Sequence, residues 1–350
     1  MGGGIWNVGS YHARAAANAA AGRSTFGYND DIHAGQTTAQ VHDLLDPSAV
    51  AGPTSQFAGQ VMREVVISDE HPNPTALAVV LDVTGSNIDA ARIVHSKLPQ
   101  LLGLLQRKGY VEDPQINFCA IGDATCDRVP LQIGQFESDN RIDEQLAALY
   151  LEGNGGGQHR ETYELAAYFL ARHTYLEPYE QYGKKGYVFF IGDEMPYNML
   201  PCGVFTDSYS RSGHSIESLI GDKLQADIPT AQIFAELQEK YEVFFLFQAQ
   251  GSYQADQILP AWRELLGERA LVLDDPSAVC EFIAGVLGML EGGLSLDEAV
   301  DDLKAIGADP KAVKVAGKAL ARVNGGGTVA KTSGNLPDLP DGGATGTTRL

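Results

Sequence analysis

Two strongly apolar runs that each stop at a carboxylate place the tightest limit on the fold. Residues 76–81 read Ala-Leu-Ala-Val-Val-Leu and lead into Asp82, while residues 187–191 read Tyr-Val-Phe-Phe-Ile and lead into Gly192 and Asp193. Runs without alternating polar positions indicate strands buried on both faces, as in parallel sheets covered by helices. We therefore expect Asp82 and Asp193 at the carboxyl ends of central strands, where open α/β sheets bind their ligands.

The rest of the chain alternates between strand-like and helix-like segments. Further strands are predicted at 61–67, 116–121, 129–136, 243–247 and 270–273. Helices are predicted at 88–106, 139–151, 161–173, 230–239, 256–266 and 276–290. This succession predicts a three-layer, Rossmann-like α/β fold, in which a central, mostly parallel sheet has one antiparallel edge strand and carries helices on both faces.

Composition divides the chain into four predicted parts. These are an irregular N-terminal arm (1–60), the α/β domain (61–292), a helical C-terminal appendage (293–324) and a disordered tail (325–350). The arm is rich in Gly, Ala, Ser and Asn, with short helices expected around 15–21 and 38–45. The appendage holds two amphipathic patterns, at 295–306 and 310–323, of which the second is basic and could dock on the acidic body, dock on an acidic partner or face solvent. The tail has too few apolar residues to offset the entropy of ordering.

The chain is strongly acidic, with 45 Asp and Glu against 25 Lys and Arg and a net charge of −20. This charge opposes binding to nucleic acid or anionic lipid and suits basic partners or divalent cations. No run reaches the ~20 apolar residues that span a bilayer, and no signal-peptide pattern opens the chain. The four cysteines include no CxxC pair, so we expect reduced thiols. We therefore expect a cytoplasmic protein with no membrane or nucleic-acid partner.

A set of oxygen donors follows the first apolar run. Asp82 is followed at alternate positions by Thr84 and Ser86, with Gly85 between the two hydroxyls. Hydroxyl and carboxylate oxygens suit a small hard cation such as Mg²⁺. The same residues would also serve as caps of the next helix. A glycine-rich loop at 153–157 lacks the spacing of a dinucleotide fingerprint and is better placed to approach a metal closely.

Over roughly residues 75–290, the chain resembles the von Willebrand factor type A (vWA) family. The resemblance rests on the motif Asp82-x-Thr84-x-Ser86, followed by the glycine loop and then by the strand that ends at Asp193. The resemblance implies a metal-ion-dependent adhesion site that binds Mg²⁺ or Mn²⁺. Thr84 and Ser86 would be ligands through their hydroxyls, and Asp82 and Asp193 would hold metal-bound waters. An open position would accept an Asp or Glu of a partner protein, which implies recognition and no enzyme activity. Bacterial intracellular members often work beside AAA+ ATPases, so the resemblance also implies such a partner.

The glycine loop departs from the family pattern. The family usually has a threonine or aspartate in this loop, and residues 155–159 read Gly-Gly-Gly-Gln-His. Gln158 could supply a carbonyl, Glu161 resembles a glutamate just past this loop in bacterial members of the family, and Thr162 is the nearest hydroxyl; Thr162 and Gln158 are the favoured candidates for the remaining ligand. His159 is expected to face solvent or donate a hydrogen bond rather than bind a metal. Asp123, at the end of another predicted strand, is either a carboxylate that supports the site or a turn residue.

Two alternatives stay open. Asp82 also resembles the nucleophile of the haloacid dehalogenase phosphotransferases, which use Mg²⁺, although Thr84 and Tyr197 stand where that family would carry further carboxylates. The chain could also be a vWA scaffold with a degenerate metal site. The long insertion at 196–229 is predicted to form one wall of the partner surface, or else an ordinary surface excursion.

Overall fold

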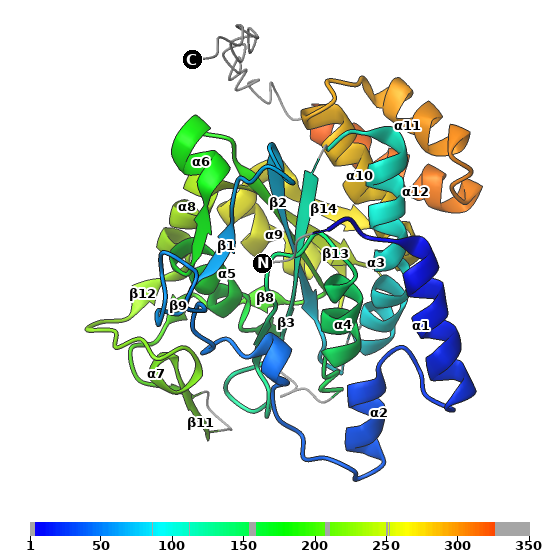
Figure 1. Ribbon diagram of the computed structural model, residues 1–350. Helices are drawn as coiled ribbons and strands as arrows, with labels where there is room; N and C mark the ends of the chain where they lie inside the picture. The colour runs from blue at the N-terminus through cyan, green and yellow to red at the C-terminus, as the bar shows by residue number, and fades with distance from the viewer. Residues whose placement is uncertain are drawn as a thin grey trace, which may run out of the picture.

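A computed structural model of the chain describes residues 4–85, 87–111, 113–153, 159–206, 211–249, 251 and 253–325. Figure 1 shows helices packed around a central sheet. Two predicted ligands, Ser86 and Gln158, lie outside the described residues, as does the predicted disordered tail beyond Gly325. Among the helices of the described residues, none is long and apolar enough to cross a membrane.

Within the described residues, six strands form the central sheet in the order β14-β13-β7-β2-β3-β4. They are β2 (Pro74–Asp82), β3 (Asp113–Ile121), β4 (Leu131–Ile133), β7 (Gly186–Gly192), β13 (Tyr241–Gln248) and β14 (Ala270–Leu273). All neighbouring pairs are parallel except β3 and β4, so β4 is an antiparallel edge strand. The predicted α/β class with a mostly parallel sheet is confirmed.

The order of strands reverses between β2 and β7. From β2 the chain adds β3 and β4 on one side, and from β7 it adds β13 and β14 on the other. Leu81 of β2 is in register with Ile191 of β7. Asp82 and Asp193 follow these two residues closely, so both acidic side chains lie where strand order reverses, the usual ligand position in such sheets.

Alternate side chains of β2 enter two apolar clusters. Leu77, Val79 and Leu81 belong to one, together with residues of α3 (Ile88–Lys108) and α10 (Val279–Leu290). Ala76, Ala78 and Val80 belong to the other, with residues of α5 (Tyr163–Arg172), α8 (Thr230–Lys240) and α9 (Ala255–Leu266). Apolar side chains at successive positions are required because both faces of β2 are buried.

The N-terminal arm is more helical than its composition indicates. It contains α1 (Val8–Ala20), the unpredicted α2 (Gly27–His33) and a 3₁₀ turn (Asp43–Leu45) where a longer helix was expected. Trp6 is buried and donates its Nε1–H to Asp143 of α4 (Arg141–Ala148), at 3.0 Å.

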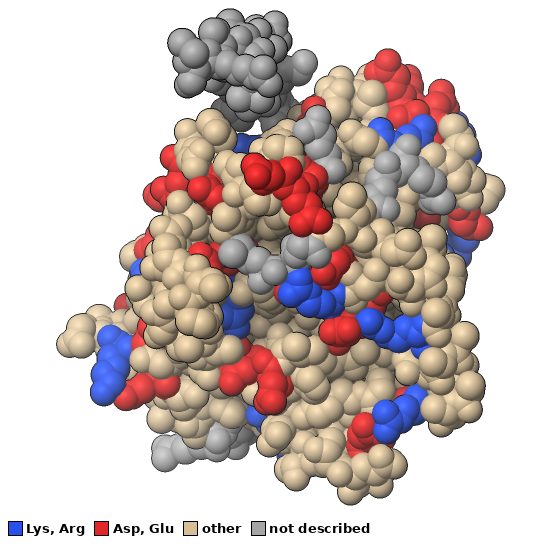
Figure 2. All heavy atoms as spheres, in the orientation of Figure 1, with Lys and Arg blue, Asp and Glu red and all other residues tan. Residues whose placement is uncertain are grey.

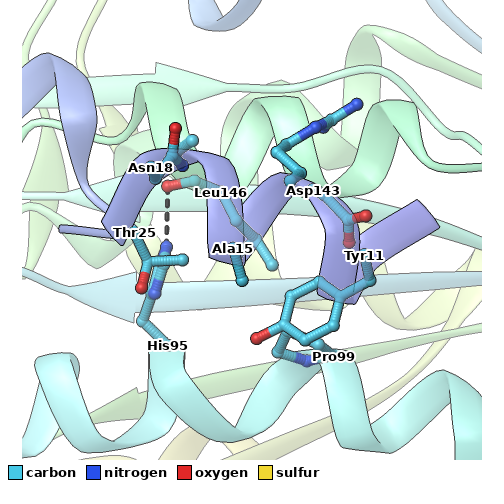
Figure 3. Close-up of a pocket in the computed structure, with 10 residues that line it drawn as sticks. Tyr11, Ala15, Asn18, Thr25, His95, Pro99, Asp143 and Leu146 are labelled. Atoms are coloured by element: carbon cyan, nitrogen blue, oxygen red, sulfur yellow. Dashed lines mark hydrogen bonds between the residues drawn. The ribbon is translucent and has the colours of Figure 1, made fainter. Parts of the chain in front are cut away.

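A small cavity of about 20 Å³ is lined by residues of α1, α3 and α4, and Figure 3 shows how these side chains lie around it. His95 lines it and donates Nε2–H to the Leu146 carbonyl at 2.7 Å. Burial lowers the pKa of His95 to about 4, so the ring is neutral. The arm is therefore joined to the sheet domain through packed and hydrogen-bonded contacts.

The predicted strand at 61–67 is shorter than expected and lies outside the central sheet. It is β1 (Arg63–Val65), which pairs in parallel with β6 (Thr174–Leu176). Nearby, α6 (Glu177–Tyr182) precedes β7. The prediction of a strand here is therefore correct, although the strand is three residues long and pairs with β6 alone.

The insertion after β7 is built from short elements. They are β8 (Met195–Pro196), β9 (Met199–Leu200), β10 (Val204–Thr206), β11 (Arg211–Ser215), α7 (Ile216–Leu219) and β12 (Ile228–Pro229). β8 pairs with β5 (Arg160–Glu161), and β9 pairs with β12. The β9–β12 pairing holds the two ends of the insertion together, and the β5–β8 pairing joins its start to the segment before α5.

The C-terminal appendage is α11 (Leu296–Ala305) and α12 (Pro310–Gly325), which pack beside α10 (Figure 1). Two lysines of the basic helix, Lys311 and Lys318, form ion pairs with Asp275 and Asp274, at 2.6 and 2.5 Å. These aspartates follow β14 and precede the 3₁₀ turn Pro276–Ala278. The sequence left three possibilities for this basic helix, and the ion pairs of these two lysines agree with docking on the acidic body.

Candidate metal-binding site

Asp82 and Asp193 form the centre of the candidate site. Both residues are fully buried. Burial, and after it the charge of Asp193, raises the pKa of Asp82 to about 7. Two neighbouring buried carboxylates do not readily both carry their charge unless a proton or a cation compensates it.

The Asp82 carboxylate is held through both of its oxygens. The backbone N–H and hydroxyl of Thr84 donate to Oδ1 at 3.0 and 2.7 Å. The Tyr163 hydroxyl donates to Oδ2 at 2.8 Å. Asn87 at the start of α3 donates to the Asp82 backbone carbonyl at 3.1 Å. A hydroxyl that gives its hydrogen to a carboxylate can still bind a cation through its oxygen, so the Thr84 hydroxyl is chemically suited to be a metal ligand.

Thr162 lies at the start of α5 and contacts the end of β3. Its hydroxyl donates to the Gly122 carbonyl at 2.5 Å and accepts from the Ala124 N–H at 3.3 Å. A hydroxyl oxygen has two lone pairs, so these bonds leave one with which it could bind a cation. Thr162 is therefore anchored and chemically competent as the remaining ligand.

Both described ends of the glycine loop are hydrogen-bonded to the segments that directly follow β2 and β7. Before the loop, the Gly153 N–H donates to the Val83 carbonyl at 3.1 Å. After it, the His159 carbonyl accepts from the Met195 N–H at 3.2 Å. The loop thus begins beside the end of β2 and ends beside the end of β7, although Gln158 itself lies outside the described residues.

Further carboxylates surround the site, of which Glu161 is the most informative. Glu161 is buried, and its Oε2 has no hydrogen-bond partner among the described residues. The pKa of Glu161 is raised well above its usual value, first by burial and then by the charges of Asp82 and Glu194. A buried, unsatisfied carboxylate oxygen costs free energy. This concentration of negative charge favours a cation nearby.

Asp123 is a turn residue that also contacts the insertion. Its Oδ1 accepts from the Thr125 N–H at 2.8 Å, and its Oδ2 accepts from the Tyr197 hydroxyl at 3.0 Å. Its own N–H donates to Asp127, whose pKa is raised to about 7, first by burial. His214 Nε2 lies 3.0 Å from the Asp127 carbonyl. Tyr197 and His214 therefore attach the insertion to the turn after β3.

His159 is exposed, which is one of the two roles expected of it, and its ring also packs against an aromatic neighbour. Its ring lies 4.2 Å from that of Tyr253, between centroids, in the connection from β13 to α9. In the same connection, a Cβ on Gly251 would lie 2.1 Å from Asp193 Oδ2. The backbone at Gly251 therefore covers one side of the Asp193 carboxylate.

Sequence reasoning missed Tyr163 and Gly251, since neither has a motif that marks it. Among the described residues, no three His, Cys, Asp or Glu side chains are grouped as a metal site. Such a grouping leaves out hydroxyl ligands, which are the predicted ligands here. The oriented Thr84 hydroxyl, the paired carboxylates and the unsatisfied Glu161 oxygen together fit a hard cation.

Comparison with known proteins adds little. No family model matches the chain, and no curated protein matches its sequence. Pilus adhesin SpaC from Lactobacillus rhamnosus GG is similar in structure at 12% identity and a TM-score of 0.42, covering 65% of this chain and 32% of the adhesin. Proximal thread matrix protein 1 from the mussel byssus is similar at 8% identity and a TM-score of 0.38, covering 61% of this chain and 48% of that protein. The chain thus spans less than half of each, and these scores are too low to carry an argument.

Proposed function

We propose that the chain contains a vWA-like domain, with the three-layer Rossmann-like arrangement, that recognises a protein partner through a bound Mg²⁺ or Mn²⁺. The cation would lie at the carboxyl edge of β2 and β7. The observation that carries the proposal is the fully buried pair Asp82 and Asp193 at the reversal of strand order, with the Thr84 hydroxyl donating to Asp82. This arrangement combines a charge that needs compensation with a hydroxyl oriented to bind the compensating cation.

In this proposal, each residue has a distinct role. Thr84 and Ser86 bind the cation through hydroxyls, Asp82 and Asp193 hold its waters, and Thr162 or Gln158 supplies the remaining oxygen. When bound, the cation offers an open coordination position that a partner's Asp or Glu can fill. In this proposal the site therefore recognises a partner protein and does not catalyse a reaction.

The charge of the chain indicates what surrounds the partner's acidic residue. A net charge of −20 repels an acidic surface at long range, while the cation attracts one carboxylate at short range. The best partner therefore presents a single acidic ligand within a basic surface. A cytoplasmic AAA+ ATPase is the partner and location that the family resemblance suggests.

Phosphoryl transfer from Asp82 has less support. Both oxygens of Asp82 accept hydrogen bonds, from Thr84 and Tyr163, which make the carboxylate a weaker nucleophile. The lysines that would serve such chemistry precede β7, at the opposite edge of the sheet. Lys184 donates to Asn73 and Lys185 donates to the Gln238 carbonyl.

Calorimetric titration with Mg²⁺ and Mn²⁺ tests the proposal. We expect the wild-type chain to bind both ions and Asp82→Ala to lose binding by more than about tenfold, because the waters of the cation lose their acceptor. Thr84→Val should weaken binding likewise. Thr174→Val is the matched control, since the Thr174 hydroxyl is also buried but bonds to the Leu170 carbonyl. Absence of metal binding by the wild type, or unchanged binding by Asp82→Ala, would overturn the proposal.

The open position can be tested separately in the Mn²⁺-loaded protein. Water relaxation reports how many exchangeable waters remain on Mn²⁺, and a peptide with one Asp in a Lys-rich sequence should displace at least one. The same peptide with Asn in place of Asp should displace none. If both peptides leave the relaxation unchanged while Mn²⁺ binds, the chain binds metal without recognising a carboxylate.

A further inference from the structure

We infer that Tyr163 is a positioning residue of the metal site, because its hydroxyl fixes the carboxylate of Asp82. This inference rests on the proposed function. The Tyr163 hydroxyl donates to Asp82 Oδ2 at 2.8 Å, and both residues are fully buried. Thr84 holds the other oxygen of the same carboxylate. With donors on Oδ1 and Oδ2, the plane of the carboxylate cannot turn without breaking a buried hydrogen bond.

Tyr163 can reach Asp82 because Gly192, which lies between them, has no side chain. Tyr163 comes from α5, Gly192 ends β7, and Asp82 ends the neighbouring strand β2. A Cβ on Gly192 would lie 1.9 Å from the Tyr163 hydroxyl and 3.0 Å from the Asp82 Cβ. Residue 192 therefore has no room for a side chain while the tyrosine occupies this position.

Aromatic neighbours hold the Tyr163 ring in a fixed orientation. Trp262 and Phe245 contact it edge to face, at 5.0 and 6.0 Å between ring centroids and with interplanar angles of 83° and 87°. Phe190 lies 6.3 Å away at 71°. Because these contacts do not involve the hydroxyl, they keep the ring in place when the hydroxyl is removed. The hydroxyl can therefore be deleted with little change in packing.

The place of Tyr163 in the chain joins two parts of the site. It directly follows Thr162, whose hydroxyl is fastened to the turn after β3. Two consecutive residues thus contribute to the site. Thr162 is a candidate ligand, and Tyr163 positions the Asp82 carboxylate. Groups that orient the residues around a metal affect affinity even though they do not touch the ion.

Mn²⁺ titration of Tyr163→Phe tests the inference. We expect the dissociation constant to rise about 10- to 100-fold, the usual effect of removing a group that orients a metal-site residue. Tyr241→Phe is the matched control, because Tyr241 is equally buried and its hydroxyl lies 2.8 Å from Thr174 Oγ1, away from the site. The control should bind Mn²⁺ like the wild type, even though it also loses one buried hydrogen bond.

The electron paramagnetic resonance spectrum of bound Mn²⁺ gives a second readout that loss of stability alone does not move. Tyr163→Phe should change the zero-field splitting, and Tyr241→Phe should not. If Tyr163→Phe does not fold, Gly192→Ala displaces the hydroxyl instead and should weaken binding in the same way. Binding by Tyr163→Phe within twofold of the wild type, or an equal loss in Tyr241→Phe, overturns the inference alone. Failure of the wild type to bind Mn²⁺ overturns the proposed function and this inference together.

Discussion

Two glycines at the carboxyl edge of the sheet determine which large or charged groups fit beside them. Gly192 leaves space for the Tyr163 hydroxyl, and Gly251 brings backbone against the Asp193 carboxylate. At both positions an added Cβ would approach another atom far more closely than van der Waals contact allows, at 1.9 and 2.1 Å. These glycines are needed for space, because neither has the positive φ that would demand glycine for its backbone.

Gly192→Ala tests this steric account through its coupling to Tyr163. The new methyl group should destabilise the protein by about 1–3 kcal/mol, the usual cost of overpacking a core. Because the nearest atom is the tyrosine hydroxyl, Tyr163→Phe should relieve part of this cost in the double variant. Chemical denaturation of the four proteins measures the coupling. Gly203→Ala, which meets no atom within 4 Å, should be near neutral, and strict additivity at 192 and 163 would contradict the account.

His95, beneath α1, should make stability sensitive to mild acid. Its pKa is lowered to about 4 by burial, so the unfolded chain binds a proton at a higher pH than the folded one. The stability that its neutral form contributes is complete above about pH 6.5 and is lost as pH falls toward 4. The pKa difference corresponds to about 3 kcal/mol. Denaturation midpoints measured across this pH window should vary less in His95→Gln than in the wild type. The glutamine amide can still donate to the Leu146 carbonyl. A pH profile of His95→Gln equal to that of the wild type would contradict this prediction.

At the scale of elements, apolar contact rather than ion pairing should hold the C-terminal appendage. Leu320 of α12 is fully buried, and a Cβ on Gly285 of α10 would lie 2.4 Å from its Cδ1. Lys318 pairs with Asp274 but is 61% exposed. Buried apolar contacts contribute much more to stability than exposed ion pairs do.

Leu320→Ala and Lys318→Ala separate these contributions. The leucine substitution should cost about 2–5 kcal/mol through lost burial and a residual cavity. The lysine substitution should cost about 0–1 kcal/mol, less at high salt. Urea denaturation followed by circular dichroism measures both. A larger loss from the lysine variant would mean that electrostatics holds the appendage.

The central elements were predictable from sequence because local patterns coincide with their burial. β2 and β7 are apolar at successive positions because both faces are covered. By contrast, α2 was missed because Gly-Tyr-Asn-Asp-Asp-Ile-His has no apolar repeat. This helix is held by tertiary contacts, such as the Leu151 N–H donating to Asn29. Local propensity cannot report such contacts.

The candidate site, like the fold, was predictable from sequence only in part. Asp82 and Asp193 were expected together because the carboxyl ends of parallel strands meet at one edge, and the structure brings them together there. The link between Tyr163 and Asp82 joins residues 81 positions apart, and no local pattern indicates it. Whether Asp82, Thr84, Thr162 and Asp193, or Ser86 and Gln158 outside the described residues, bind a cation stays a prediction, as do the domain boundaries.

At the scale of the whole molecule, net charge and the local site should respond differently to ions. The excess of 20 negative charges disfavours the compact state by self-repulsion, which any salt screens. Figure 2 shows Lys and Arg interspersed with Asp and Glu on one face, without a broad basic patch. General screening should therefore stabilise the fold modestly. A specific cation site should add a further effect that depends on metal concentration as binding does.

Thermal unfolding in MgCl₂ and in NaCl of equal ionic strength separates the two effects. An ion that binds only the folded state at about 100 times its Kd adds about 2.7 kcal/mol of stability. For a chain of this size that corresponds to a rise in Tm of about 4 °C over NaCl. Asp82→Ala should lose this difference and keep the response to NaCl, because the substitution removes one site and leaves the distributed charge almost unchanged. Equal melting temperatures in both salts for the wild type would mean that its buried carboxylates are compensated by protons rather than by a cation.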